Sequence, residues 1–232
     1  MTTLWKLNKD EVITAALRKL AVLSGGTTPQ TYQVSDATQA LNAMVKGFQV
    51  DGMPVWAMKS FTFNVIEGQP QYVIGEGQAL DTSAPLKVTQ AWRTQGDNTA
   101  NIPMNVYTDY NYNLLPLSVS SGTPVNLYYQ PFGATGNINL WPIPNDDTVT
   151  ITMRYQRPFT DMVDATDDFD FPSYWTEALI YGLADRLAPE YGLPLQDRSA
   201  LKAEAKDFHE QALSFGTEEG GLFFQPDWSG RR

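Results

Sequence analysis

Five aspartates form the densest group of titratable side chains in the sequence: Asp161, Asp164, Asp167, Asp168 and Asp170. Clustered carboxylates can hold a hard cation such as Ca²⁺, or they can repel the phosphates of DNA. A calcium loop of the helix–loop–helix type needs glycine at its sixth position and glutamate at its twelfth, and the run VDATDDFDFPSY has neither. We therefore expect no metal site. We interpret the run as a solvated loop leading into a helix, and a surface that repels DNA stays open as the alternative.

Other sets of catalytic side chains are missing from the sequence. His209 is the only histidine and cysteine is absent, which excludes the usual zinc ligand sets and a cysteine nucleophile. The sequence has neither the glycine-rich phosphate loops nor the G-x-S-x-G turn of a serine nucleophile. A glycosidase needs two carboxylates on elements that flank a cleft, whereas these aspartates share one segment. We predict no enzymatic activity and no cofactor, and we expect His209 to be structural, at the edge of a helix's apolar stripe.

Composition and charge narrow the class of protein further. The chain has 232 residues, of which 42% are hydrophobic and 12% aromatic, so it can bury a core of its own. No apolar run is long enough to span a bilayer, and the N-terminus lacks the apolar stretch of a secretory signal. With 16 basic and 26 acidic residues the net charge is −10, and such a chain does not grip a phosphate backbone. We expect a soluble protein that folds in the cytoplasm of its producer.

Aromatic side chains gather in two places. One group lies in the middle of the chain and consists of Trp92, Tyr107, Tyr110, Tyr112, Tyr128, Tyr129 and Trp141. These rings either fill the core of a β-rich segment or lie exposed and bind a partner or a sugar. The other group lies between glycines near the C-terminus and consists of Leu222, Phe223, Phe224 and Trp228, followed by Arg231 and Arg232. We predict that this tail docks into a groove on another subunit, with the arginines contacting an acidic partner.

Helical periodicity appears near both ends of the chain. It predicts helices over residues 9–23, 36–51, 173–188 and 196–215. Asn8 and Glu11 have the spacing of a capping box, residues 27–35 read as a loop, and Phe215 is in phase with the apolar stripe of the last helix. The expected core of the four helices consists of Leu17, Leu20, Leu41, Met44, Trp175, Leu179, Leu183, Leu201 and Phe208.

Between the helices the hydrophobic period changes to two. Strands are expected near residues 61–65, 72–74, 86–93, 101–107, 124–130, 137–141 and 148–157. The alternation is clearest over 148–157, which predicts one buried and one wet face, as in an antiparallel sheet. Residues 137–141 are expected to pair with this last strand across Pro142 and Pro144.

The expected fold class is therefore α+β. It consists of an antiparallel helical bundle of two N-terminal and two C-terminal helices, an inserted antiparallel β lobe and an extended C-terminal tail. The expected boundaries are 1–58 for the N-terminal helices, 59–158 for the β-rich lobe, 159–216 for the C-terminal helices and 217–232 for the docking tail.

Several segments resemble a known protein family. They are LNAMVKGFQVDGMPVWAMKSFTF at 41–63, LWPIP at 140–144, RPFTDMVDATDDFDFP at 157–172 and DFPSYWTEALIYGLADRLAPEYGLP at 170–194. In these segments and in the order of its elements, the chain resembles the head-to-tail adaptors of short-tailed bacteriophages. These proteins are also called tail tubular protein A or packaged-DNA stabilisation proteins.

The resemblance implies a structural virion protein at the junction of capsid and tail, assembled in the host cytoplasm. Such adaptors form a ring, typically twelvefold, beneath the portal protein, where they extend the DNA channel and help to retain packaged DNA. The implied partners are the portal, other copies of the chain, the tail nozzle and the tail fibres. DNA would pass through without specific binding, and no membrane is involved. The helices would form the ring wall and the aromatic tail would dock on the portal. Candidates for lining the channel are Asp161, Asp164, Asp167 and Asp168.

Other functions remain open on the residues alone. The β lobe could be a carbohydrate-binding or receptor-binding tail module that uses exposed aromatic rings. A cell-wall hydrolase built on the carboxylates is a second rival. A stopper or a tail-completion protein would share the acidity and the tendency to form rings.

Overall fold

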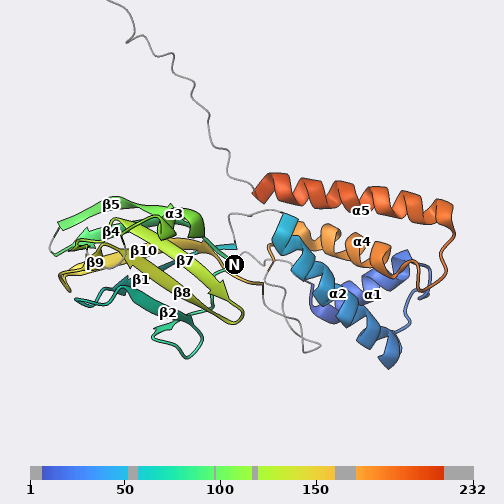
Figure 1. Ribbon diagram of the computed structural model, residues 1–232. Helices are drawn as coiled ribbons and strands as arrows, with labels where there is room; N and C mark the ends of the chain where they lie inside the picture. Colours follow the sequence, from blue (N-terminus) through green and yellow to red (C-terminus); the bar gives the residue numbers. More distant parts are fainter. Residues whose placement is uncertain (1–6, 52–56, 97, 117–119, 160–170, 217–232) are drawn as a thin grey trace, which may run out of the picture.

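The structure is a computed structural model, which describes residues 7–51, 57–96, 98–116, 120–159 and 171–216. Its helices are α1 (Lys9–Lys19), α2 (Thr31–Asp51), α3 (Asp109–Asn113), the 3-10 turn η2 (Ser173–Trp175), α4 (Thr176–Leu187) and α5 (Leu195–Gly216). Its strands are β1 (Met58–Asn64), β2 (Gln71–Gly75), β3 (Leu80–Asp81), β4 (Lys87–Gln95), β5 (Asn98–Tyr107), β6 (Ser121–Gly122), β7 (Asn126–Phe132), β8 (Thr135–Trp141), β9 (Ile143–Pro144) and β10 (Val149–Gln156). Figure 1 shows the strands with α3 on one side, which we call the sheet part, and α1, α2, η2, α4 and α5 on the other, which we call the helical part.

The largest element is an eight-stranded sheet in the order β1-β10-β4-β5-β7-β8-β2-β3. Most neighbours are antiparallel, but β5 pairs with β7 and β2 pairs with β3 in parallel, so the sheet is mixed. It curls into a nearly closed barrel around one core to which β1, β2, β4, β5, β7, β8 and β10 all contribute. Beyond β1, the backbone N–H of Ile66 donates to the hydroxyl of Tyr72 at 2.7 Å, which links the first strand to β2.

The expected fold class, a helical bundle with an inserted antiparallel β lobe and an extended tail, is wrong. The dominant element of the described residues is the mixed eight-stranded barrel, accompanied by five α-helices, and residues 217–232 of the expected tail lie outside the described residues. The physical reason is that alternation along a strand reports which side chains are buried. It does not report how many strands join one sheet, or in which direction a neighbouring strand runs.

The pairing expected for residues 137–141 is also wrong. β8 lies between β7 and β2, with Asn126 opposite Trp141 and Tyr72 opposite Ile138, whereas β10 lies between β1 and β4. The predicted buried face of the last strand is confirmed, since Val149, Ile151, Met153 and Tyr155 are fully buried. Gln156, expected on the wet face, is only 4% exposed. A local pattern thus identified the buried face of β10, although it misplaced the neighbour of β8.

Near the N-terminus, hydrogen bonds and backbone conformation within a few residues determine where the helices begin and end. The predicted capping box is confirmed, because the side chain of Asn8 accepts from the N–H of Glu11 and that of Glu11 accepts from the N–H of Asn8, both at 2.9 Å. α1 ends at Lys19, earlier than predicted, because Ala21 adopts a left-handed φ of 56°. α2 begins at Thr31 instead of residue 36. Just before this start, the N–H of Gln30 donates to the side-chain oxygen of Gln33 at 2.9 Å. No helix of the described ranges is long and apolar enough to cross a bilayer.

Tyr129 of β7 forms a hydrogen bond to the segment that precedes β4. The ring of Tyr129 covers Gly136 on the neighbouring strand β8, where a Cβ would collide with the ring. The Tyr129 hydroxyl donates to the carbonyl oxygen of Pro85, just before β4, at 2.6 Å. Burial, and to a lesser extent the nearby Tyr155, raises the pKa of Tyr129 to about 12. Tyr129 therefore folds as a neutral hydrogen-bond donor.

This raised pKa predicts a loss of stability in alkali. A tyrosine in the unfolded chain has a pKa of about 10, so from there up to about pH 12 the unfolded state loses its proton before the folded state does. The free energy of unfolding should therefore fall with pH across this window. The variant Tyr129→Phe should show a smaller fall than the wild type in urea titrations at successive pH values. Tyr110→Phe, at a site that is 73% exposed, is the matched control and should keep the wild-type slope. An unchanged slope in Tyr129→Phe would refute this role.

Candidate functional site

Two chain segments connect the sheet part to the helical part, and they pair with each other. Beyond the β1–β10 ladder, the N–H of Arg157 donates to the carbonyl oxygen of Ala57 at 3.0 Å. On the helix side, the amide of Gln156 donates to the backbone oxygen of Gln49 in α2 at 3.3 Å. The ammonium group of Lys46 donates to the backbone oxygen of Phe159 at 3.0 Å. In the part of the chain that the structure describes, the connection is therefore hydrogen-bonded at Ala57 on one segment and at residues 156–159 on the other.

A column of aromatic rings continues from this connection into the helices. The rings of Phe159 and Phe171 lie 4.9 Å apart, and those of Phe171 and Trp175 lie 5.3 Å apart. His209 of α5 lies 5.7 Å from Trp175 and stacks at 4.5 Å on Phe48 of α2. His209 is half-buried, as expected for a structural histidine. Such contacts add to the stabilisation that comes from burying the rings, and they join three segments that are distant in sequence.

The residues that flank the acidic segment in the sequence, Phe159 and Phe171, form the first ring pair of this column. Asp161, Asp164, Asp167, Asp168 and Asp170 lie in 160–170, outside the described residues. The residues that flank it, Phe159 and Phe171, are 2% exposed and in ring contact. Both ends of the segment are therefore anchored at one place, beside the connection between sheet and helices. The sequence carried one signal for this anchoring, namely the four-residue spacing of Phe171 and Trp175 at a helix start.

Tyr174 of η2 and Phe215 of α5 form an exposed aromatic pair. Phe215, near the C-terminus of α5, is 76% exposed, and its ring is 4.8 Å from that of Tyr174, which is 38% exposed. The expectation that Phe215 joins the apolar stripe of its helix is wrong, because its ring contacts Tyr174 of η2 at the surface and stays largely exposed. A large exposed apolar pair of this kind is typical of contact surfaces. Leu222, Phe223, Phe224, Trp228, Arg231 and Arg232 follow in sequence, outside the described residues.

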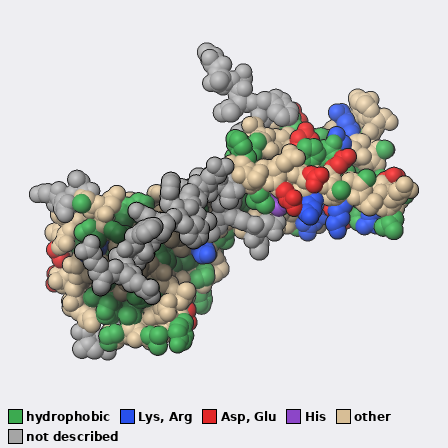
Figure 2. Space-filling view, turned by 90° about the horizontal axis from the view of Figure 1, so that it is seen from above, with side chains coloured by type: hydrophobic (Ala, Val, Ile, Leu, Met, Phe, Trp, Pro, Cys, Tyr) green, Lys and Arg blue, Asp and Glu red, His purple; other side chains and the backbone are tan. Residues whose placement is uncertain are grey.

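The other residues singled out by the sequence fall into two environments. Leu17, Leu20, Leu41, Met44, Trp175, Leu179, Leu183 and Leu201 are buried in the helical core, and Phe208 packs half-buried against it. By contrast, the seven aromatic residues singled out in the middle of the sequence are all described, and none of them is fully buried: Trp92, Tyr107, Tyr110, Tyr112, Tyr128, Tyr129 and Trp141. The core of the sheet part is mostly aliphatic, and the aromatic rings buried in it are those of Phe63, Tyr72 and Tyr155. Figure 2 shows acidic and basic side chains gathered on the helical part and fewer of them on the visible face of the sheet part.

Comparison with known proteins identifies one family. The model of the SU10 adaptor protein family matches residues 7–219 of the chain, which takes in both the helical part and the sheet part. No curated protein matches the chain.

The aromatic column predicts a clear difference between two phenylalanines. Phe171→Ala removes a buried ring from contact with Phe159 and Trp175, and should lower the free energy of unfolding by about 3–5 kcal/mol. Phe215→Ala removes a ring that is largely in solvent and should change this free energy by about 0.5 kcal/mol or less. Urea unfolding followed by tryptophan fluorescence measures both variants. Equal losses in the two variants would contradict the assignment of Phe171 to the core.

Proposed function

The chain belongs to the SU10 adaptor protein family of phage structural adaptors, and from that premise we propose that it is a head-to-tail adaptor of a short-tailed bacteriophage. Copies of the chain form a ring, typically twelvefold, beneath the portal protein at the junction of capsid and tail. The ring extends the DNA channel, helps to retain packaged DNA and carries the tail nozzle and fibres. The observation that carries this proposal is the match over residues 7–219, because it includes both parts of the protein. The role is structural, without catalysis, and needs no cofactor.

The exposed pair Tyr174–Phe215 belongs to the surface that docks on the portal. It lies where the chain leaves α5 for the C-terminal segment, which holds the further aromatic residues Phe223, Phe224 and Trp228. Large rings that are exposed in the free protein and buried in a complex contribute much of the binding free energy at protein interfaces. The pair and the segment therefore act together as one aromatic anchor.

The acidic segment faces the DNA channel of the ring. The residues that flank it, Phe159 and Phe171, are in ring contact, and Asp161, Asp164, Asp167 and Asp168 lie between them in the sequence. A wall of carboxylates repels the DNA phosphates and lets the genome pass without being held on the wall.

Truncation tests the docking surface. A chain that ends at residue 216 should keep the thermal melting curve of the full chain and should fail to form rings on the portal of the same phage in electron micrographs. Phe215→Ala should weaken the same binding. Ala203→Ser, an exposed substitution on α5, is the control and should bind as the wild type does. Unchanged portal binding by the truncated chain would overturn the docking assignment, whereas failure of the full chain to bind any portal would overturn the adaptor function itself.

Neutralising the aspartates tests the channel assignment. Portal–adaptor connectors that carry Asn at 161, 164, 167 and 168 should retain double-stranded DNA more strongly, and the excess retention should disappear as salt is raised. The control removes four exposed charges from α5, at Asp197, Glu204, Asp207 and Glu210, and so makes the same change in net charge. DNA passage that responds equally to both sets would show that only net charge matters, and would refute a channel-facing acidic segment.

A further inference from the structure

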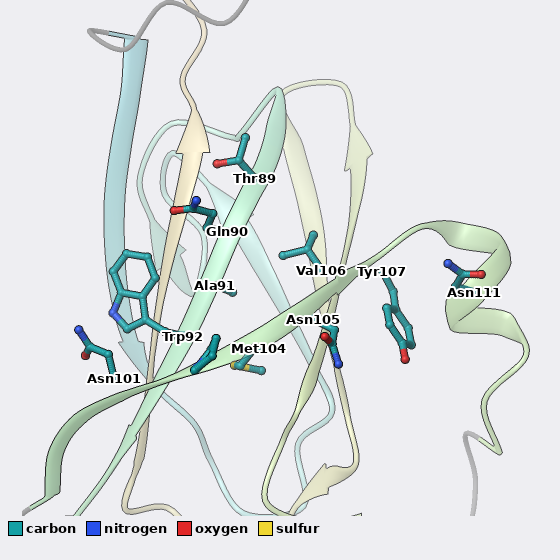
Figure 3. A pocket seen from close by; sticks show the side chains of 11 residues that line it. Thr89, Gln90, Ala91, Trp92, Asn101, Met104, Asn105, Val106, Tyr107 and Asn111 are labelled. Carbon is teal, nitrogen blue, oxygen red and sulfur yellow. The ribbon is translucent and has the colours of Figure 1, made fainter. Parts of the chain in front are cut away.

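A cavity opens in the sheet part where β4 and β5 separate. The two strands pair from Gln95 and Asn98 as far as Ala91 and Met104. The next residues of β5, 105–107, pair instead with residues 126–128 of β7. Residues 87–90 of β4 consequently have no β5 partner among the described strand pairings. A cavity of about 790 Å³ lies in this split, and Figure 3 shows the two strands diverging around it.

The lining of the cavity combines polar and apolar side chains and is uncharged. It includes four carboxamide side chains, an indole and a phenol, contributed by Gln90, Asn101, Asn105, Asn111, Trp92 and Tyr107. Of the described residues that line it, none carries a charge, although the chain as a whole has a net charge of −10. A carboxamide both donates and accepts hydrogen bonds, and an aromatic ring offers an apolar face. The lining therefore suits a neutral ligand that has hydroxyl groups and apolar C–H faces.

Side-chain contacts hold parts of this lining in place before any ligand arrives. The side-chain amide of Asn105 donates to the side-chain oxygen of Asn126, which is 3% exposed, at 3.0 Å. The helix that carries Asn111 is tied to β7, because the hydroxyl of Tyr128 donates to a carboxylate oxygen of Asp109 at 2.8 Å. The ring of Tyr128 also stacks on Tyr112 at 5.1 Å. Preorganised side chains lose less entropy on binding, which favours affinity.

The polar and aromatic groups occupy both ends of the cavity. In Figure 3, Trp92 and Asn101 lie at one end, and Tyr107 and Asn111 lie at the other, with Met104 and Asn105 between them. Each end thus offers one aromatic ring and one carboxamide. An elongated ligand with repeated units matches this arrangement better than a single small ring.

We propose that this cleft binds a short neutral oligosaccharide. The hydroxyl groups of the sugar bond to the carboxamides, and its C–H faces pack on Trp92 and Tyr107. An added peptide strand fits less well, because the free edge of β4 spans only residues 87–90 and is interrupted by a register shift in its pairing with β10. The adjoining edge of β5 is already paired with β7. This binding activity is separate from ring formation, and it gives the adaptor a contact with carbohydrate on the sheet part.

Direct titration of the full chain tests the proposal. The probes are chitohexaose, maltohexaose and cellohexaose at millimolar concentration, measured by isothermal titration and by saturation-transfer NMR. At least one should bind. Trp92→Ala and Asn111→Ala should each lower its affinity roughly tenfold, the loss expected for one buried contact or hydrogen bond. Asn113→Ala, on the same short helix but outside the lining, is the matched control and should bind as the wild type does.

Three outcomes would overturn the inference. One is no binding of any of the three hexasaccharides, and another is binding that Trp92→Ala and Asn111→Ala leave unchanged. The third is binding of extended peptides and of no sugar, which would mean that the ligand of the cleft is a peptide. Asn111 is exposed, so its variant keeps the test decisive even if Trp92→Ala fails to fold. Ring formation on the portal should be normal in both variants, which separates this test from that of the adaptor function.

Discussion

The paired connection between β10 and the helices is the contact on which the rest of the protein depends. Ala57 and Phe159 lie on its two segments and are buried in the helical core, at 0% and 2% exposure. Two segments of a chain can enter an apolar core only if their backbone N–H and C=O groups are hydrogen-bonded. Here the N–H of Arg157 donates to the carbonyl oxygen of Ala57. The pairing of β1 with β10 thus continues for one step beyond the sheet, at Ala57 and Arg157, where the two segments reach the helical core.

The aromatic column makes this connection useful for assembly. It includes Phe159 and Phe171, the residues on either side of a strongly acidic segment, and it continues through Trp175 to His209 of α5. Like charges that are crowded on one segment repel each other and cost stability when they are packed into a core. The rings that flank the segment, Phe159 and Phe171, are buried in the helical core. Under the proposed function, one structural device thus provides both a wall of negative charge and a rigid base for the exposed pair Tyr174–Phe215.

The change of partner in β5 gives the sheet part a feature that a regular barrel lacks. After Met104 the strand leaves β4 and joins β7, so its own backbone groups remain paired while a cleft opens beside it. Trp92, Tyr107 and four carboxamide side chains line this cleft, whereas the core is filled mostly by aliphatic residues and methionine, together with the rings of Phe63, Tyr72 and Tyr155. The helical part therefore carries the features that suit assembly, and the sheet part carries the uncharged cleft.

The sequence by itself determined the features that depend on near neighbours along the chain. The capping box at Asn8, the buried face of β10 and the approximate position of each long strand follow from local spacing, because hydrogen bonds and burial repeat with the geometry of one element. Only the tertiary structure decided the rest. The parallel pairing of β5 with β7, the place of β8 beside β2 and the exposure of Phe215 depend on which distant surface is available to cover each element. Periodicity shows that an apolar face needs a partner, and the packing of the whole chain decides which partner it receives.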